Sequence, residues 1–123
     1  MRYCLGMKLG YTIIYVADVP KTVAFYETAF GLTQRFIHES DLYAEMETGG
    51  TVLSFAGNEA AEMSGLAIIP NDPTGPAAGW EICFVTDDVS AAYEHAVANG
   101  CSPVIPRVLV IDVFWPNLWS RLR

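Results

Sequence analysis

The sequence has few basic residues, few histidines and no long apolar run. Seven Lys or Arg stand against fourteen Asp or Glu, which gives a formal net charge of −7 over 123 residues. Such a chain repels nucleic-acid phosphates and anionic membrane surfaces, so neither is expected as a partner. No run reaches the roughly 18 apolar residues that a membrane-spanning helix needs. The charge leaves a weak preference for cationic small molecules.

Cysteine is also scarce, and the common catalytic motifs are absent. Cys4, Cys83 and Cys101 lack the spacing of a metal site, and any pairing leaves one thiol over. This favours reduced thiols and a cytoplasmic location. No P-loop, HExxH, GxGxxG or Ser-His-Asp pattern occurs. His38 and His95 are expected to be ordinary surface or half-buried residues, so no motif indicates an enzyme.

Apolar residues, in contrast, are plentiful. Hydrophobic residues make up 52% of the chain and charged residues 17%. The composition predicts a globular protein with surplus apolar surface for a cavity or a subunit interface. The length predicts one domain that buries roughly two-thirds of its unfolded surface.

The chain contains two similar stretches, YTIIYVADVPKTVAFYETAFG at residues 11–31 and WEICFVTDDVSAAYEHAVANG at residues 80–100. Each begins with a β-branched and aromatic run that predicts a strand. For residues 13–16, the continuous run predicts a strand that is buried on both faces or lies at a pocket floor. Asp18, and later Asp87 or Asp88, is then expected to cap an amphipathic helix that a glycine ends. Asp87 follows Asp18 at the same distance at which Gly100 follows Gly31. This repeated spacing predicts two copies of one small unit.

The segments between and after these stretches complete the two units. Strands are predicted at 33–39, 41–48 and 51–56, joined by turns at Ser40-Asp41 and Gly49-Gly50. The first unit is therefore β-α-β-β-β over residues 11–56, and residues 57–79 are predicted to be a linker. The second unit, residues 80–123, is shortened, with its further strands expected at 103–105, 108–113 and 118–122.

This order resembles the vicinal oxygen chelate superfamily, also called the glyoxalase/bleomycin resistance/dioxygenase fold. The resemblance rests on YVADVPKTVAFYETAFGL (Tyr15 to Leu32), on FVTDDVSAAYEHAVANG (Phe84 to Gly100) and on DVFWPNLWS (Asp112 to Ser120), an altered form of the family's closing turn. It implies an α+β fold, a single domain over residues 1–123 in which two βαβββ modules form a curled sheet, or half-barrel, around a pocket.

Family enzymes hold a divalent metal through His or Glu on the first and last strand of each module. The resemblance places these residues at the four positions: Tyr11, Ser54, Glu81 and Ser120. Only Glu81 is a competent ligand for a catalytic divalent ion, so we expect no cofactor. The alternative is one divalent metal held unconventionally by Glu81 with Glu45 or Glu47.

Aromatic residues are frequent on the strands that are expected to face the pocket or its rim. The residues predicted to bind a ligand are Tyr11, Tyr43, Ser54, Phe55, Trp80, Glu81, Trp115 and Trp119. Together with Phe36 and the carboxylates of Glu45 and Glu47, they suit a flat or cationic ligand, at about 0.5 to 2 kcal/mol per contact. Packing in the core is the alternative explanation for each aromatic residue.

Three functions remain open on the sequence. The first is a metal-independent homodimer of the bleomycin-resistance type that sequesters an aromatic or cationic small molecule such as an antibiotic. The second is a metal-dependent enzyme, either a glyoxalase-type lyase or isomerase or an extradiol-type dioxygenase. The third is a truncated, inactive relative whose unfinished barrel is covered by dimerisation or strand exchange between subunits.

Overall fold

The computed structural model describes residues 6–79 and 81–103. The strands predicted at 108–113 and 118–122 lie outside the described residues. Within the described part, no helix is both long enough and apolar enough to cross a membrane.

The chain divides into two compact units. The first comprises Met1–Glu27 and Leu32–Pro70, and the second comprises Thr28–Gly31 and Asn71–Arg123.

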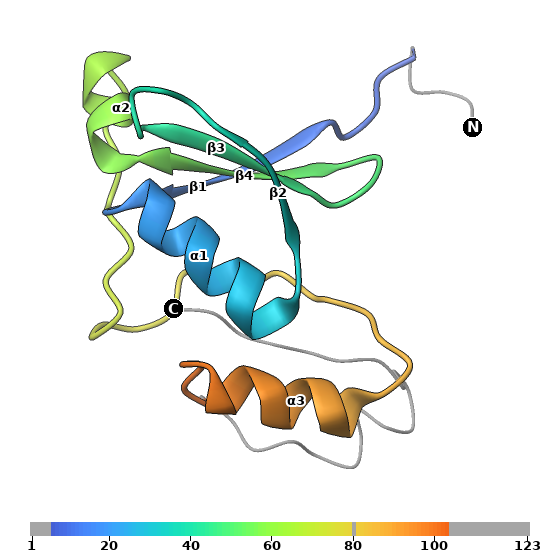
Figure 1. The fold of residues 1–123 in the computed structure, drawn as a ribbon. Coiled ribbons are helices and arrows are strands. Elements are labelled where there is room, and N and C mark those ends of the chain that lie inside the picture. Colours follow the sequence, from blue (N-terminus) through green and yellow to red (C-terminus); the bar gives the residue numbers. More distant parts are fainter. Residues whose placement is uncertain (1–5, 80, 104–123) are drawn as a thin grey trace. The chain divides into compact units, whose positions relative to one another are not determined.

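The first unit is a curled four-stranded sheet with a helix across one face (Figure 1). Its strands are β1 (Tyr11–Val16), β2 (Thr33–Ile37), β3 (Tyr43–Glu47) and β4 (Val52–Gly57). Their spatial order is β1-β4-β3-β2, in which β1 runs parallel to β4 and the other neighbours are antiparallel. The β-α-β-β-β order predicted from the sequence is confirmed.

The helix between β1 and β2 is α1 (Val19–Phe30), and its two ends form as the sequence predicts. Asp18 Oδ1 accepts a hydrogen bond from the Lys21 amide at 3.0 Å and so caps the first turn. Pro20 lies in that turn, where its missing N–H costs no intrahelical hydrogen bond. Gly31 follows the last turn with a φ of 67°, a conformation that glycine adopts without strain.

The core of the first unit lies between α1 and the sheet. It is formed by the buried residues Val19, Val23, Tyr26, Ala44, Met46 and Phe55. All six residues of β4 are buried. In β1, by contrast, Ile13 is 44% exposed, so burial of residues 13–16 on both faces is wrong, while their place at a pocket floor stays a prediction. The reason is topological, because β4 is an inner strand of the sheet and β1 is an outer one.

A short helix, α2 (Asn58–Met63), follows β4 in the segment where no regular structure was predicted. Its N-cap is Gly57, which makes no side-chain capping bond, so the usual sequence signal for a helix start is missing. A Cβ at Gly57 would lie 2.9 Å from Leu42 Cδ2, so a larger residue here would require the tip of the Leu42 side chain to shift. The chain leaves α2 through Gly65, whose φ is 73°.

The second unit contains α3 (Val89–Ala98), the helix predicted in the second copy. The structure decides between the two candidate caps, because Asp88 Oδ1 accepts from the Ala91 amide at 3.0 Å. Gly100 ends the helix with a φ of 105°. Residues 81–86 do not form the predicted strand. A strand requires a hydrogen-bonded neighbour, and most of those predicted for it lie outside the described residues.

Candidate functional site

The sheet of the first unit has a polar and aromatic face opposite the one that α1 covers. Ser54 on β4 is in register with Ile13 on β1 and with Glu45 on β3, and Glu45 is in register with Phe36 on β2. Residues in register across a sheet present their side chains on the same face. We call this surface the site face, and its members are Tyr11, Ile13, Arg35, Phe36, Tyr43, Glu45, Glu47 and Ser54.

Three buried or half-buried polar groups lie at the centre of the site face. The Tyr43 hydroxyl donates to Glu45 Oε2 at 2.9 Å and is hydrogen-bonded to the Ser54 hydroxyl at 3.1 Å. Ser54 is fully buried and Glu45 is nearly so. Burial raises the pKa of Tyr43, and its hydrogen bond to Glu45 acts in the same direction, although the bond with Ser54 opposes it. Tyr43 is therefore a neutral hydroxyl that donates to a buried carboxylate.

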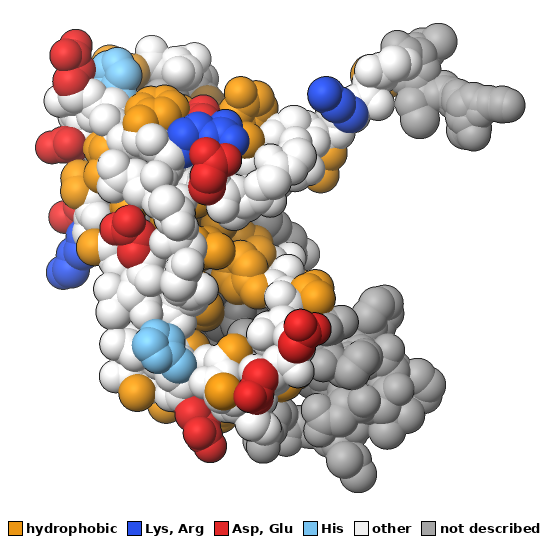
Figure 2. Space-filling view, turned by 45° about the vertical axis from the view of Figure 1, so that its right-hand side comes forward, with side chains coloured by type: hydrophobic (Ala, Val, Ile, Leu, Met, Phe, Trp, Pro, Cys, Tyr) orange, Lys and Arg blue, Asp and Glu red, His pale blue; other side chains and the backbone are white. Residues whose placement is uncertain are grey.

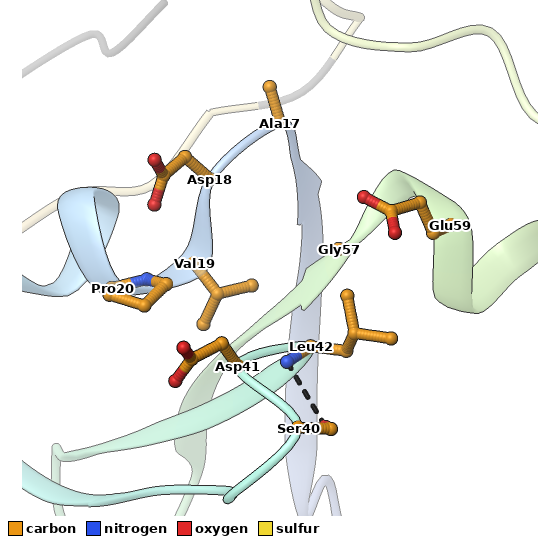
Figure 3. Close-up of a pocket in the computed structure, with 9 residues that line it drawn as sticks. All are labelled: Ala17, Asp18, Val19, Pro20, Ser40, Asp41, Leu42, Gly57 and Glu59. Atoms are coloured by element: carbon orange, nitrogen blue, oxygen red, sulfur yellow. Dashed lines mark hydrogen bonds between the residues drawn. The ribbon is translucent and has the colours of Figure 1, made fainter.

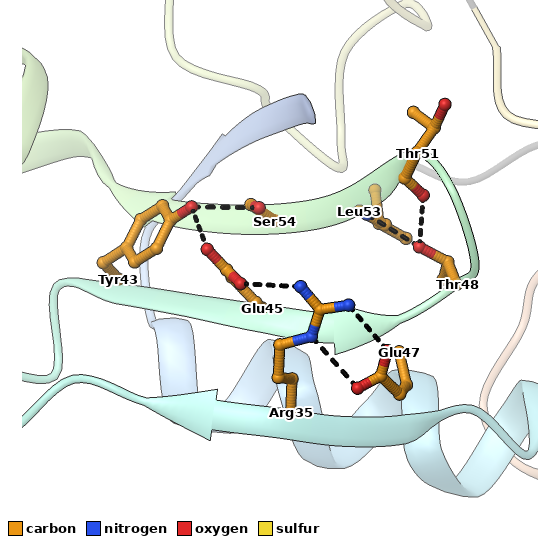
Figure 4. Close-up of polar contacts among 8 residues, drawn as sticks. All are labelled: Arg35, Tyr43, Glu45, Glu47, Thr48, Thr51, Leu53 and Ser54. Carbon is orange, nitrogen blue, oxygen red and sulfur yellow. Dashed lines mark hydrogen bonds and ion pairs between the residues drawn. The ribbon is translucent and has the colours of Figure 1, made fainter. Parts of the chain in front are cut away.

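Arg35 reaches from β2 to two carboxylates on β3 (Figure 4). Its Nε donates to Glu47 Oε2 at 3.0 Å and its Nη2 to Glu47 Oε1 at 2.6 Å. Its Nη1 donates to Glu45 Oε1 at 3.3 Å. The hydrogen bonds from Arg35 hold the pKa of Glu47 below its ordinary value, and Glu47 in turn raises the pKa of Arg35. The ion pair and the Tyr43 hydroxyl thus link β2, β3 and β4 in one network.

This network corrects the expected electrostatics. Glu45 and Glu47 were expected to place negative charge near a ligand, and Arg35 binds both of them and so neutralises part of that charge. Sequence reasoning missed Arg35, even though the predicted turn at Ser40-Asp41 brings its strand beside that of the two glutamates. The signal was the pairing of unlike charges across a hairpin, and an extra residue in β2 concealed the register.

The aromatic residues of the first unit divide between the two faces of the sheet. On the site face, Tyr11 and Phe36 are 56% and 39% exposed, and the rings of Phe36 and Tyr43 lie 6.0 Å apart. Phe55 is fully buried on the other face, where its ring lies 4.6 Å from that of Tyr26 on α1. The expectation that Phe55 faces the pocket is therefore wrong, because the alternation along β4 directs it into the core.

The remaining predicted site residues belong to the second unit or lie outside the described residues. Glu81 is an exposed residue of the second unit. Trp80, Trp115, Trp119 and Ser120 are not among the described residues.

Neither histidine lies among metal-type ligands in the described part of the chain. His38 Nδ1 is hydrogen-bonded to the Ser40 hydroxyl at 2.8 Å, within the β2–β3 turn. In the second unit, His95 Nε2 lies 2.8 Å from the carbonyl oxygen of Thr28. Both side chains are exposed, which fits the ordinary role predicted for them.

The thiols of Cys83 and Cys101, the cysteines within the described residues, are not activated for nucleophilic chemistry. Burial raises the pKa of Cys83, and the negative charge of Glu81 adds to the effect. Burial also raises the pKa of Cys101. A reactive cysteine needs the opposite shift, toward the thiolate.

A separate pocket of about 490 Å³ opens at one end of the sheet of the first unit (Figure 3). Its lining comes from the start of α1, the β2–β3 turn and the start of α2, and consists of Ala17, Asp18, Val19, Pro20, Ser40, Asp41, Leu42, Gly57 and Glu59. Of its three carboxylates, that of Asp18 is used to cap α1. The sequence did not predict this pocket.

The first-unit positions that the family uses for its metal do not fit a divalent ion here. Tyr11 and Ser54 offer hydroxyl groups, and that of Ser54 is hydrogen-bonded to Tyr43. Catalytic divalent metals are held by carboxylates and imidazoles. In the described ranges, no group of three His, Cys, Asp or Glu residues is arranged to hold a metal ion. The described residues of the first unit therefore do not form a site that suits a catalytic divalent ion.

The face of the molecule drawn in Figure 2 shows no concentration of basic charge among the described residues. Acidic side chains are scattered over the face drawn in Figure 2 rather than gathered in one patch, and basic side chains are few on it. This distribution agrees with the composition and gives a nucleic-acid phosphate backbone no basic surface on that face.

Several solved structures share this fold. A glyoxalase/bleomycin resistance protein/dioxygenase from Nocardioides aligns with a TM-score of 0.64 at 20% identity, over 85% of this chain and 69% of its own. A family enzyme from Burkholderia phytofirmans PsJN aligns with a TM-score of 0.56 at 25% identity, over 76% and 74%. A glyoxalase-related enzyme from Fulvimarina pelagi aligns with a TM-score of 0.60 at 18% identity, over 76% of this chain and 65% of its own. No curated protein is significantly similar in sequence.

The curled sheet, its parallel β1–β4 pair and its covering helix define an α+β protein of the βαβββ class. The sequence model of the Glyoxalase/Bleomycin resistance protein/Dioxygenase superfamily matches residues 8–110, and the chain belongs to this superfamily. The resemblance seen in the sequence is confirmed.

Proposed function

We propose that this protein binds an aromatic small molecule on the site face and holds it without a metal and without transforming it. One observation carries the proposal. Where family enzymes place metal ligands on the first module, this chain has the hydroxyl groups of Tyr11 and Ser54, beside partly exposed aromatic rings. The proposal includes an antibiotic-like ligand and a cytoplasmic homodimer.

The chemistry of the site face supports binding by stacking. Tyr11 and Phe36 are large, partly exposed aromatic side chains, and the Phe36 ring already lies beside that of Tyr43. Offset or edge-to-face ring pairs contribute about 0.5–1.5 kcal/mol beyond the area that they bury. The buried hydroxyl of Ser54 and the buried carboxylate of Glu45 supply fixed polar groups, as small-molecule sites commonly have. A cation would find both glutamates already paired with Arg35.

Metal independence is tested by thermal unfolding of chelator-treated protein with Ni, Co, Mn, Zn or Fe(II), one at a time. Specific binding at a hundred times the dissociation constant adds about 2.7 kcal/mol, which raises the melting temperature of a domain of this size by several degrees. We expect no shift with any metal. A shift with one of them would replace the proposal by the metal-dependent lyase, isomerase or dioxygenase.

Ligand binding is tested by the same assay with a panel of flat aromatic compounds. We expect a stabilising compound whose effect is reduced in Tyr11→Ala, because this change removes an exposed ring from the site face. Met63→Ala is the matched control, since Met63 is 79% exposed on α2 and lies outside the site face. Equal loss in both variants, or no stabilising compound at all, would contradict the proposal.

A further inference from the structure

The second strand carries an extra residue at the position of Arg35. Gln34 is in register with Met46, and Phe36 with Glu45, so the pairing skips Arg35. Such a β-bulge re-aims side chains and is frequent beside active sites. Strict alternation would send Arg35 and Phe36 to opposite faces. The bulge instead lets the guanidinium reach Glu45 and Glu47 while Phe36 lies beside Tyr43 on the same face.

The two carboxylates that Arg35 contacts differ in how firmly they are held. The Glu45 side chain is 11% exposed and also accepts a hydrogen bond from Tyr43. The Glu47 side chain is 52% exposed, yet it takes the two shorter contacts from Arg35, at 3.0 and 2.6 Å. The buried carboxylate of Glu45 therefore contacts one nitrogen of the guanidinium. The edge formed by Nε and Nη2 of Arg35 is directed to the carboxylate of Glu47, which lies near solvent.

A guanidinium that binds an exposed carboxylate in this manner offers the geometry that a ligand carboxylate needs. An exposed ion pair contributes little to stability, so exchanging Glu47 for another carboxylate costs little. We propose that Arg35 receives the carboxylate of an aromatic acid, that Glu47 occupies this position in the free protein, and that Phe36 and Tyr43 contact the attached ring. This inference rests on the proposed small-molecule binding and names its ligand class.

A cationic ligand fits the same residues less well. It would have to displace Arg35 from Glu45, whose carboxylate is buried, and removing the partner of a buried charge is costly. The overall charge of −7 includes Glu45 and Glu47, which Arg35 contacts directly, while charges that lie more than about 8 Å away are largely screened at physiological ionic strength. The close contacts of Arg35 decide the preference.

The test compares three naphthalene probes of similar shape by NMR titration of isotope-labelled protein: 2-naphthoate, 2-naphthalenemethanol and 2-naphthylmethylamine. We expect the acid to bind most tightly, with the largest shifts at backbone amides of β2 and β3. In Glu47→Gln the acid should bind up to about fivefold more tightly, because its competitor for Arg35 is gone. In Arg35→Lys it should bind about tenfold more weakly, because a lysine lacks the planar two-pronged geometry.

Glu27→Gln, an exposed change on α1, removes the same charge elsewhere and should leave all three affinities unchanged. If the ion pair had a purely structural role, Glu47→Gln would not bind 2-naphthoate more tightly than the wild type. If the alcohol binds as well as the acid and Glu47→Gln has no effect, this inference is overturned while the proposed function stands. Preference for the amine would also overturn it. If none of the probes binds the wild type or Glu47→Gln, both proposals fail.

Discussion

Arg35 binds the carboxylate of Glu47 through two of its nitrogens, Nε at 3.0 Å and Nη2 at 2.6 Å, across the β2–β3 pair. A third nitrogen reaches the buried Glu45. One basic residue therefore determines how much negative charge the site face presents. Arg35 therefore affects both the stability of the first unit and the charge of the site face.

Acid should weaken the first unit through Glu47. The hydrogen bonds from Arg35 hold the pKa of Glu47 below its ordinary value near 4.5. The folded state thus gains stability from ionised Glu47 above that value, and this gain is lost as the pH falls through the lowered pKa. Urea unfolding between pH 7 and pH 3 should show the loss in the wild type and a smaller loss in Glu47→Gln. Glu27→Gln should behave as the wild type, and an equal acid response in all three proteins would exclude this role of the pair.

The turn between β3 and β4 offers a matched pair of glycines. Gly49 has a φ of 92°, whereas the φ of Gly50 is not positive. At both positions an added Cβ would find no other atom within 4 Å. We expect Gly49→Ala to lower the free energy of unfolding by about 1 kcal/mol, because alanine is strained in that conformation. Gly50→Ala should change it by less than about 0.5 kcal/mol. Denaturant unfolding measures both, and equal effects would show that the conformation of Gly49 is not the cause.

Phe55 and Phe36 lie on opposite faces of the sheet and should respond differently to truncation. Phe55→Ala opens a cavity against Tyr26 and should cost about 3–5 kcal/mol of unfolding free energy. Phe36→Ala removes a partly exposed ring and should cost about 1 kcal/mol or less, while reducing ligand binding. Urea midpoints and a ligand titration separate the two roles. Comparable stability losses would argue against the assignment of the two faces.

The start of α3 is fixed by Asp88 rather than by its neighbour Asp87. Asp88→Ala removes the acceptor of the Ala91 amide and should destabilise the helix by about 1 kcal/mol. Asp87→Ala deletes the same charge one residue earlier and should have little effect. Hydrogen exchange of the first-turn amides of α3 gives the readout, and faster exchange in both variants alike would assign the effect to charge instead of capping.

The sequence by itself determined the family, the β-α-β-β-β order over residues 11–56, both ends of α1 and the glycine that ends α3, whereas the structure chose Asp88 over Asp87 as the cap of α3. Those features depend on local chemistry: Asp18 offers a capping oxygen wherever the helix begins, and Gly31 tolerates a positive φ in any surroundings. The turns at Ser40-Asp41 and Gly49-Gly50 were readable for the same reason. The helix α2 was not, because its N-cap, Gly57, makes no side-chain capping bond and so leaves no local signal in the sequence.

Tertiary structure alone decided which side chains share a face. The alternation along β4 sends Ser54 to the site face and Phe55 to the core, and a shift of one residue would reverse this assignment. The bulge at Arg35 interrupts that alternation in β2, which is why the pairing of Arg35 with both Glu45 and Glu47 was not predicted. Strand register is a property of paired chains, whereas a helix cap is a property of adjacent residues, and this difference separates what could be predicted from what could not.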